Sequence, residues 1–324
     1  MKRTFAFLFA ALFSLSVFVS CGSAPAETAT APETATAETE TAAPQKDTKQ
    51  QEVQDPAEDG VLRILLIGNS FCYYYPDEIY GMLKSAGIRA EVANVYYSGC
   101  TLSQHWDWYD METNYRFILY SDSGKRLEDD KNMRYCLDAR NWDIISFQQH
   151  FSPGRTETYE IAFESCEAPL RALLKAVARK KPMARLVWNE TWAYQVGYEL
   201  PEKKMAVKST EDQTHQYQVI HDVSKKLCEE FSLPCVPLGE AWQLARAKSE
   251  VGDRLCNKKN GTTDSYHDGD AGGGQFLNAC VWYEFLTGQS CLENNFKPDS
   301  YSLSAELTAA LKEAAHQAME EWER

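Results

Sequence analysis

Short apolar runs alternate with longer amphipathic segments from Val61 to the end of the sequence. The short runs predict buried strands, and the longer segments, in which apolar residues recur every three or four positions, predict helices. This alternation is typical of a parallel sheet covered by helices. The predicted strands span 61–67, 90–95, 143–147, 184–188 and 235–237. The predicted helices span 76–86, 156–179, 213–231, 240–249, 274–286 and 304–322.

One region, residues 101–140, interrupts the alternation. Inside it, the segment 115–128 has Asp122-Ser123-Gly124 at its middle, and a short polar turn of this kind predicts a β-hairpin. We therefore expect one folded domain over residues 61–324, with a hairpin inserted after the second strand.

The first 20 residues have the pattern of a bacterial export signal. Lys2 and Arg3 precede an apolar run over residues 5–19, which is too short for a typical membrane span. The residues Phe18-Val19-Ser20-Cys21 resemble a lipobox, in which the cysteine is lipidated at sulfur and becomes the new N-terminus. We therefore expect an exported lipoprotein that is attached to the bacterial membrane only through Cys21. An ordinary secretory signal that contains a cysteine is the alternative.

Residues 21–60 consist mainly of Ala, Thr, Glu and Pro and contain no aromatic residue. A segment of this composition cannot bury enough apolar surface to fold. We expect a disordered linker, which as a flexible coil spans roughly 35 Å root-mean-square.

The chain carries 33 basic and 47 acidic residues, which gives a net charge of -14. Such a surface repels phosphate backbones and no basic cluster offsets it, so we exclude nucleic acid as a partner. Nine of the ten cysteines follow Cys21, and their spacing fits no zinc motif of the Cys-x-x-Cys type. Because nine is odd, at least one thiol stays free. We expect neither a metal nor another cofactor.

A candidate nucleophile follows the first predicted strand. Its apolar residues run into Gly68-Asn69-Ser70, and a helix is predicted to begin six residues after Ser70. The carboxyl ends of parallel strands form the ligand crevice of an open sheet, and a helix N-terminus there favours a developing anion. Ser70 therefore lies where a reactive hydroxyl is useful, although a turn serine that caps the next helix fits the same tripeptide.

A carboxylate and a histidine stand near the other end of the domain. Asp264 precedes His267 by three residues in a polar, glycine-rich segment. This spacing lets both side chains project from one turn, so that the carboxylate orients one ring nitrogen while the other faces a nucleophile. A solvated loop histidine is the alternative interpretation.

Aromatic residues gather after the second and the fourth predicted strands. Rings at such positions stack on sugars, and we expect Trp192 and Tyr194 to contact a carbohydrate. Packing in the core is the alternative for both. His150 follows the third strand directly after Gln149, and we expect it to line the crevice.

Six motifs in a fixed order are similar to those of one family. They are Gly68 to Phe71; Gly99-Cys100 with Leu102 and His105; Trp142-Asp143 with Gln148-Gln149; Thr191 to Tyr194; Asp264 with His267; and Trp282 to Gly288. Together they resemble the SGNH/GDSL hydrolase superfamily, in a branch catalogued as a domain of unknown function. The resemblance covers residues 61–324. It implies a flavodoxin-like three-layer α/β/α sandwich with a five-stranded parallel sheet, and the activity of an ester hydrolase.

The resemblance also assigns roles to individual residues. It implies that Ser70 is the nucleophile, His267 its general base and Asp264 the residue that orients the base. The backbone N–H groups of Ser70 and Gly99 would form the oxyanion hole.

The third oxyanion donor of the superfamily is a side-chain Asn, and this sequence departs from that pattern. We expect the amide of Gln149 to serve in its place, with Gln148 and Asn189 as alternatives. The usual Asp before the nucleophile is Asn69 here, as it is in the narrower branch.

These features predict a tethered serine esterase that removes acyl groups, acetyl in particular, from a carbohydrate. A glycan-binding lipoprotein without catalysis is the alternative, but a pure binder needs no Ser70, Asp264 and His267 in this arrangement. A lipase would require a more apolar crevice than this polar, Gln-rich one.

Overall fold

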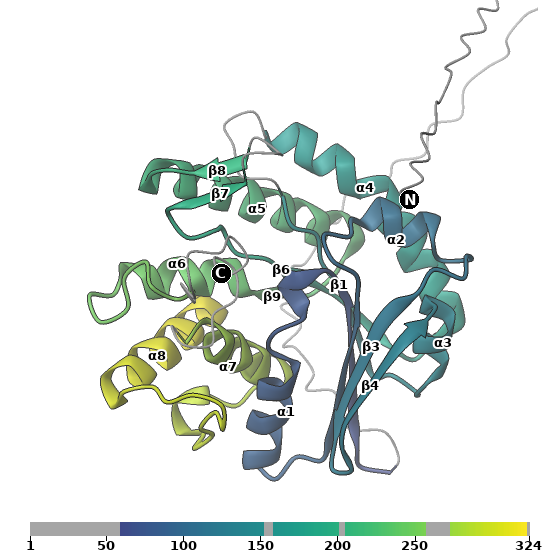
Figure 1. Ribbon diagram of the computed structural model, residues 1–324, viewed down its shortest axis with the longest axis horizontal. Coiled ribbons are helices and arrows are strands. Elements are labelled where there is room, and N and C mark those ends of the chain that lie inside the picture. The colour runs from purple at the N-terminus through teal and green to yellow at the C-terminus, as the bar shows by residue number, and fades with distance from the viewer. Residues whose placement is uncertain (1–58, 152–157, 201–204, 257–272, 323–324) are drawn as a thin grey trace, which may run out of the picture. The chain divides into compact units, whose positions relative to one another are not determined.

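The computed structural model describes residues 59–151, 158–200, 205–256 and 273–322, and all of them belong to one compact unit (Figure 1). Their main sheet has the strand order β4-β3-β2-β1-β5-β6-β9. Its strands are β1 (Leu62–Gly68), β2 (Ala90–Tyr96), β3 (Tyr115–Ser121), β4 (Gly124–Lys131), β5 (Ile144–Phe147), β6 (Arg185–Glu190) and β9 (Cys235–Pro237). A separate antiparallel pair consists of β7 (Tyr198–Leu200) and β8 (Met205–Val207).

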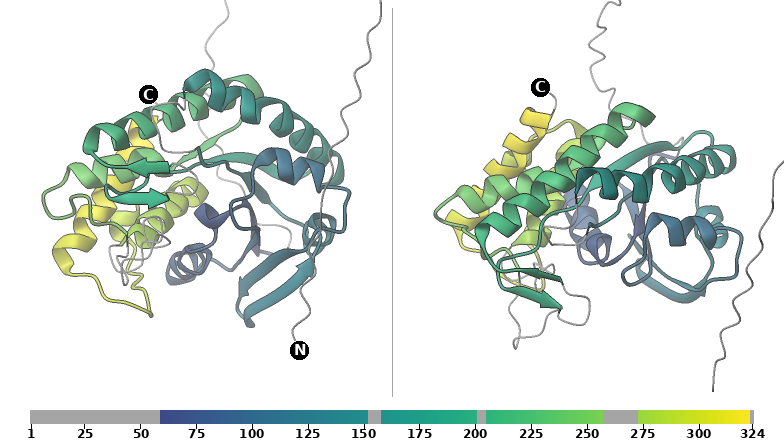
Figure 2. Two further views of the ribbon diagram at one scale, coloured as in Figure 1. Left: turned by 45° about the horizontal axis from the view of Figure 1, so that its top comes forward. Right: turned by 90° about the horizontal axis from the view of Figure 1, so that it is seen from above.

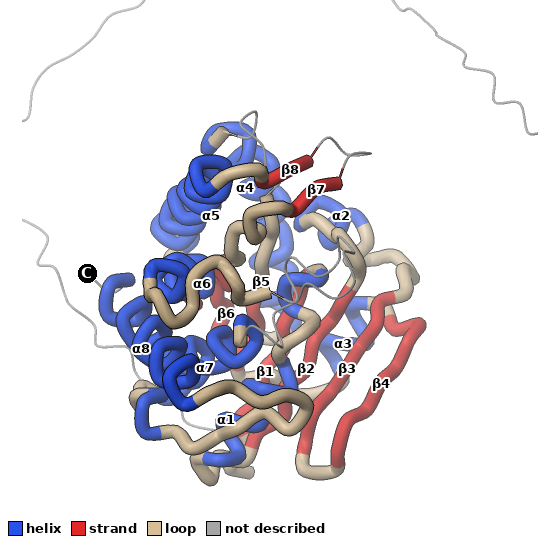
Figure 3. Tube along the Cα trace, turned by 60° about the vertical axis from the view of Figure 1, so that its left-hand side comes forward, coloured by secondary structure: helices blue, strands red, loops and turns tan. Residues whose placement is uncertain are grey.

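The five predicted strands are confirmed as the parallel part of this sheet, because β2, β1, β5, β6 and β9 pair in parallel in that order. The predicted hairpin is also confirmed as β3 and β4, which pair in antiparallel fashion. Its place was not foreseen. β3 pairs with β2, so the hairpin extends the sheet to seven strands rather than five, with β4 at one edge (Figure 3).

Helices pack on both faces of the sheet, as the alternation predicts (Figure 2). One core contains residues of α1 (Pro76–Ser85), α6 (Leu238–Ala247), α7 (Gly274–Thr287) and α8 (Ala305–Trp322). The other contains residues of α2 (Leu102–Asp107), α3 (Met133–Asp138), α4 (Tyr159–Lys180) and α5 (Thr210–Phe231). The short helices α2 and α3 were not predicted, because six residues are too few for a helical period to show.

The central strand β1 is buried on both faces. Leu62, Ile64 and Leu66 enter the core beneath α1 and α7, whereas Leu65 and Ile67 enter the core beneath α4 and α5. Side chains alternate between the two faces of a strand, so the uninterrupted apolar run from Ile64 to Ile67 fits between two helical layers.

The order of the parallel strands marks the end of β1 as the expected position of a ligand site. The chain moves from β1 to β2 on one side, and later from β1's other neighbour β5 outward to β6 and β9. In open α/β sheets, ligands bind outside the carboxyl ends of the strands where the winding direction reverses. The residues that follow β1, β2 and β5 therefore surround this point. Among the described helices, none is long and apolar enough to cross a membrane.

Candidate active site at the carboxyl end of the central strand

Ser70 begins a short 3₁₀ turn, Ser70–Cys72, directly after β1. Asn69 caps this turn, because its side chain accepts a hydrogen bond from the N–H of Phe71. Phe71 is buried, whereas Ser70 is only half-buried. The turn thus holds Ser70 between two buried residues, Asn69 and Phe71, and leaves Ser70 itself partly exposed.

Asn69 joins the ends of three strands. Its Oδ1 accepts hydrogen bonds from Phe71 N (3.1 Å) and from Gln148 Nε2 (2.9 Å), and its Nδ2 donates to Cys100 O (3.0 Å). Cys100 lies in the loop after β2, and Gln148 directly follows β5. Only 5% of Asn69 is exposed, so these hydrogen bonds are made away from solvent, where an unpaired amide is costly.

Gly68 makes room for the Gln148 side chain. A Cβ atom at residue 68 would lie 2.1 Å from Gln148 Nε2 and 2.7 Å from Gln148 Cγ. The amide of Gln148 therefore occupies the space that a side chain at position 68 would fill. This contact explains why Gly, Asn and Gln occur together in two motifs that are 79 residues apart.

Gly99 lies in an exposed loop that is hydrogen-bonded to Gly68 and Asn69, just before the Ser70–Cys72 turn. Its φ is 64°, and a Cβ there would meet nothing within 4 Å. Hydrogen bonds hold the loop on both sides of it: Tyr97 N donates to Gly68 O (3.3 Å), and Asn69 holds Cys100 O. The backbone at Gly99 is thus open to a ligand and fixed relative to the end of β1.

Gln149, the expected oxyanion donor, points away from Ser70. Its Nε2 donates to Ser165 Oγ on α4 (3.0 Å), and its Oε1 accepts from Leu102 N at the start of α2 (2.9 Å). With both ends of the amide occupied, the structure places Gln149 as a link between α2 and α4. This orientation does not support the expected role.

The two alternative donors also use their N–H groups elsewhere. Gln148 donates to Asn69, as described above. Asn189 Nδ2 donates to Tyr75 OH (3.2 Å), and Asn189 Oδ1 accepts from Trp282 Nε1 (3.1 Å). These hydrogen bonds tie the amide nitrogens of Gln148 and Asn189 to neighbouring protein groups and do not support either residue as the third oxyanion donor.

His150 lies against the Ser70–Cys72 turn, with its ring stacked on Phe71 at 3.7 Å between centroids. Gln216 determines which ring nitrogen of neutral His150 carries the proton. Gln216 Oε1 accepts from Tyr194 N (3.0 Å), so the neighbouring Nε2 donates to His150 Nε2 (3.2 Å). The proton of the neutral ring then lies on Nδ1, which faces Thr191 Oγ1 at 3.4 Å. Gln216 was missed in the sequence, because nothing in α5 marks a residue whose partner is 66 positions away.

Trp192 is in the core and not at the rim, contrary to the expectation of a sugar contact. Only 1% of it is exposed, and its ring stacks on Trp242 with 4.5 Å between centroids. Tyr194 is also buried, stacks on Tyr198 and meets the edge of His150. Burial raises the pKa of Tyr194 well above its usual range. The aromatic residues after β6 therefore pack in the core, where Trp192 and Tyr194 contact Phe71 of the Ser70–Cys72 turn.

His105, from the motif after β2, is a fully buried residue of α2. Its Nδ1 lies 3.1 Å from Tyr115 OH. Burial lowers the pKa of His105 to about 3, although the Gly68 backbone opposes this shift. The ring is therefore neutral near pH 7 and has a structural role beside the end of β1.

A second titratable group is the last residue of β6, Glu190. Glu190 is buried, and burial raises its pKa. One carboxylate oxygen accepts from Glu240 N in the first turn of α6 (3.0 Å), and the other is 3.2 Å from His221 Nδ1. These contacts identify Glu190 as the cap of α6.

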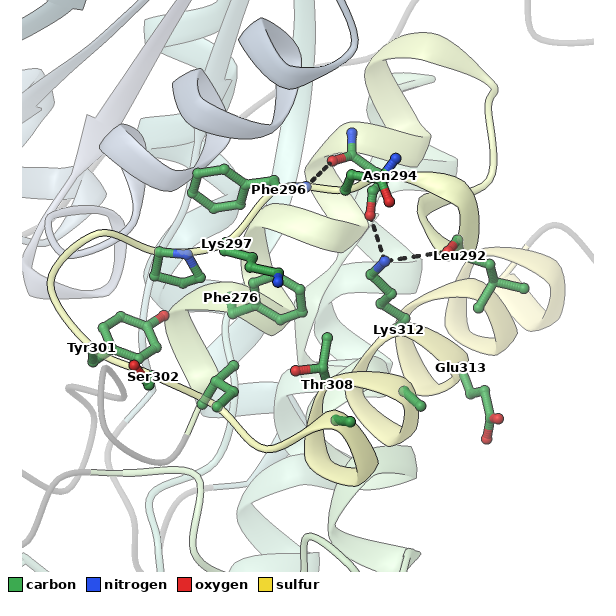
Figure 4. Close-up of a pocket in the computed structure, with 15 residues that line it drawn as sticks. Phe276, Leu292, Asn294, Phe296, Lys297, Tyr301, Ser302, Thr308, Lys312 and Glu313 are labelled. Carbon is green, nitrogen blue, oxygen red and sulfur yellow. Dashed lines mark hydrogen bonds between the residues drawn. The ribbon is translucent and has the colours of Figure 1, made fainter.

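The cavities found among the described residues do not coincide with this site. One of about 650 Å³ lies between α7, α8 and the segment 292–303, and Phe276, Asn294 and Tyr301 are among its lining residues (Figure 4). None of the predicted site residues lines it.

Three of the predicted functional residues lie outside the described residues: Cys21, Asp264 and His267. The segment that contains Asp264 and His267 directly precedes α7, which begins after Gly273 with φ 86°. In the part of the chain that is described, no three His, Cys, Asp or Glu side chains are placed to hold a metal ion. None of the nine cysteines in this part of the chain is in a disulfide.

The family of the chain follows from its sequence. Residues 63–318 match the family described as a domain of unknown function, DUF4886, and the chain belongs to this family. The part of the motif resemblance that points to a domain of unknown function is thereby confirmed. None of the curated proteins matches the chain.

A solved structure of a member of the family shows the same fold, and two other solved structures resemble the chain more distantly. A DUF4886 family protein from Bacteroides uniformis is 24% identical, with a TM-score of 0.68, over 82% of this chain and 96% of that chain. A candidate SGNH hydrolase from Slackia heliotrinireducens is 20% identical, with a TM-score of 0.44, over 69% of this chain and 98% of that one. A catalytic mutant of an acetylxylan esterase from Geobacillus stearothermophilus is 15% identical, with a TM-score of 0.42, over 69% of this chain and 94% of that chain.

Proposed function

We propose that this protein is a serine esterase that hydrolyses acyl esters, acetyl esters in particular, on a carbohydrate. The observation that carries the proposal is the position of Ser70. It begins a capped turn at the carboxyl end of the central strand, half-buried, with the open backbone of Gly99 on the neighbouring loop. A serine hydroxyl next to two backbone N–H groups of this kind is what acyl transfer requires.

In the proposed reaction, His267 takes the proton of Ser70 Oγ as the oxygen attacks the ester carbonyl carbon, and Asp264 orients the histidine. The negative charge that forms on the carbonyl oxygen is stabilised by the N–H groups of Ser70 and Gly99. The sugar oxygen leaves with the proton from His267. Water then attacks the acyl-enzyme by the same route, and the acid and free Ser70 are regenerated. His150 is an unsuitable base, since its Nε2 already accepts from Gln216.

The carbohydrate part of the proposal now depends on different aromatic residues. Trp192 is buried, but Tyr97 and Trp106 are 41% and 40% exposed. Tyr97 is two residues from Gly99, and its ring packs edge-on against Trp108. An exposed ring beside the oxyanion loop is placed to stack on the sugar that carries the ester.

The proposal is tested with a fluorophosphonate probe and with 4-nitrophenyl acetate and acetylated xylo-oligosaccharides. We expect the purified domain to be labelled at Ser70 and to release acetate from the oligosaccharides. Tyr97→Ala and Trp106→Ala should raise KM for the oligosaccharides and leave 4-nitrophenyl acetate hydrolysis unchanged. A domain that binds glycans without labelling or turnover would instead be the non-catalytic binder.

We also propose that the protein is exported and anchored through lipidated Cys21, which the export pattern and the adjacent linker composition support. Fractionation of cells that express the full chain tests this. Cys21→Ser should move the protein from the membrane pellet to the soluble fraction. If the variant pellets as the parent does, the anchor is not at Cys21.

A further inference from the structure

We propose that Asn69 is a positioning residue that sets the distance between the two N–H groups of the oxyanion hole, and that Gln148 holds Asn69 in the required orientation. The proposal rests on the proposed function, because it assigns Ser70 and Gly99 to one oxyanion hole. It adds a role for the Asn that stands where the superfamily has Asp, and for a Gln that no longer serves as a donor to the substrate.

The two N–H groups belong to different loops, so something must fix their separation. Ser70 follows β1, and Gly99 follows β2. Beyond the strand pairing, which ends at Gly68 and Tyr96, the loops are joined by Tyr97 N to Gly68 O and by Asn69 Nδ2 to Cys100 O. The second of these bonds connects the residue before Ser70 to the residue after Gly99.

The hydrogen bonds leave Asn69 one orientation. Its Oδ1 must be the acceptor, because Phe71 N–H donates to it, and its Nδ2 must be the donor, because Cys100 O accepts from it. Gln148 must then present Nε2 to Oδ1. A carboxylate at position 69 keeps both acceptor contacts, but it has no hydrogen to donate to Cys100 O.

Gln148 is committed to this arrangement. Its side chain is 1% exposed and lies in the space above Gly68. Its Oε1 is buried and makes no hydrogen bond to any described residue. The donation from Nε2 to Asn69 is thus the hydrogen bond that the described residues show for the Gln148 side chain, and it fixes which way this amide faces.

The molecule contains a matched control, Asn294, which is hydrogen-bonded to the C-terminal end of α1. Its Oδ1 accepts from Phe296 N (2.9 Å), as Figure 4 shows. The same oxygen accepts from Ser85 Oγ (2.7 Å), and Nδ2 donates to Met82 O (3.1 Å). It is 6% exposed, against 5% for Asn69. The two residues therefore make the same three kinds of hydrogen bond at the same burial, but only Asn69 adjoins the site.

The test compares Asn69→Asp with Asn294→Asp, and Gln148→Met with Ser85→Ala, on 4-nitrophenyl acetate at pH 8. Misplacing a reacting group by about 1 Å costs on the order of 10²-fold, so we expect the Asn69 and Gln148 variants to lose about 10- to 100-fold in kcat with little change in KM. Labelling by the fluorophosphonate should slow by the same factor. The Asn294 and Ser85 variants should keep near-parental kcat, although both pairs lose thermal stability to a similar extent.

Hydrogen–deuterium exchange gives a readout that does not need activity. Asn69→Asp should increase exchange in the peptide 97–102, and Asn294→Asp should not. The proposal is overturned if Asn69→Asp and Asn294→Asp change kcat equally, or if the exchange of 97–102 is unchanged. If the parent is neither labelled nor active while exchange responds as expected, the proposed function fails and the link between the loops stands.

Discussion

The turns at Asn69 and Asn294 have the same chemistry and different surroundings. Each asparagine accepts from the backbone N–H two residues later, accepts from one side chain and donates to one carbonyl. Asn69 is followed by half-buried Ser70 at the end of the central strand, whereas Asn294 is followed by exposed Asn295 between two helices. An asparagine turn is thus a general device for fixing a loop. Its place at the carboxyl edge of the sheet is what makes one of the two a candidate for catalysis.

The largest difference in activity between the two turns is expected when the residue after each asparagine is changed. Ser70→Ala removes the proposed nucleophile and should lower kcat/KM for 4-nitrophenyl acetate by at least about 10³-fold. Asn295→Ala, the equivalent change in the other turn, should leave it unchanged. Steady-state kinetics of the two purified variants checks this. Hydrolysis that persists in Ser70→Ala would mean that another residue is the nucleophile.

The next largest effect is expected at the glycine that supports each turn. A Cβ at Gly68 would press on Gln148, and a Cβ at Gly81 would lie 2.3 Å from the ring of Phe296, which follows Asn294 by two residues. Overpacking of this kind destabilises a protein by roughly 1–3 kcal/mol, so Gly68→Ala and Gly81→Ala should both unfold at lower temperature. Gly68→Ala alone should also reduce kcat, by about 10-fold or more, because it displaces the partner of Asn69.

Calorimetry and kinetics on the same preparations separate the two contributions. Equal losses of turnover in Gly68→Ala and Gly81→Ala would show that activity follows overall stability and not the geometry of the Asn69 turn.

The smallest expected effect is on the pH dependence of stability, through the pair of Glu284 and His316 near the Asn294 turn. Glu284 accepts from Cys291 N (2.7 Å), just before Asn294, and also contacts His316 Nδ1 (2.9 Å). The hydrogen bond to Glu284 raises the pKa of His316. A raised pKa in the folded state stabilises the protein fully below the unfolded pKa of about 6.5, and this contribution is lost as the pH rises through the folded pKa.

His316→Asn should therefore lower the melting temperature near pH 6 and have less effect near pH 9. Because the pair is partly exposed, the difference in unfolding free energy should be about 0.2–1 kcal/mol. Thermal unfolding of both proteins across this pH range measures it. Catalysis should have the same pH dependence in both, since the pair is on the Asn294 side.

The fold was largely predictable because its signals are local. β1, β2 and β5 are buried on both faces and stand out as short apolar runs, and Asp122-Ser123-Gly124 marks the turn between β3 and β4. The pairing of β3 with β2 was not predictable, because it depends on which edge of the sheet the hairpin reaches. The stacking of Trp192 on Trp242 was hidden for the same reason, since the partner is 50 residues away.

The site was predictable to the extent that it follows from strand ends. Ser70 and Gly99 lie after β1 and β2 as expected, but the choice between Gln148 and Gln149 depends on which face of β5 each side chain takes. Gln148 faces Cys72 and the end of β1, whereas Gln149 faces α2 and α4. Alternation along the strand shows that the two differ, but it does not show which one reaches Asn69.

The two edge strands of the sheet have a consequence for self-association. An open edge offers unpaired N–H and C=O groups to a strand of another copy, which is a route to aggregation. At one edge, β4 is mostly exposed and carries six charged residues in eight, namely Lys125, Arg126, Glu128, Asp129, Asp130 and Lys131. At the other, β9 has three residues and ends at Pro237, which has no N–H to donate. Both edges therefore disfavour strand addition, and copies of the chain can crowd together without polymerising through their sheets.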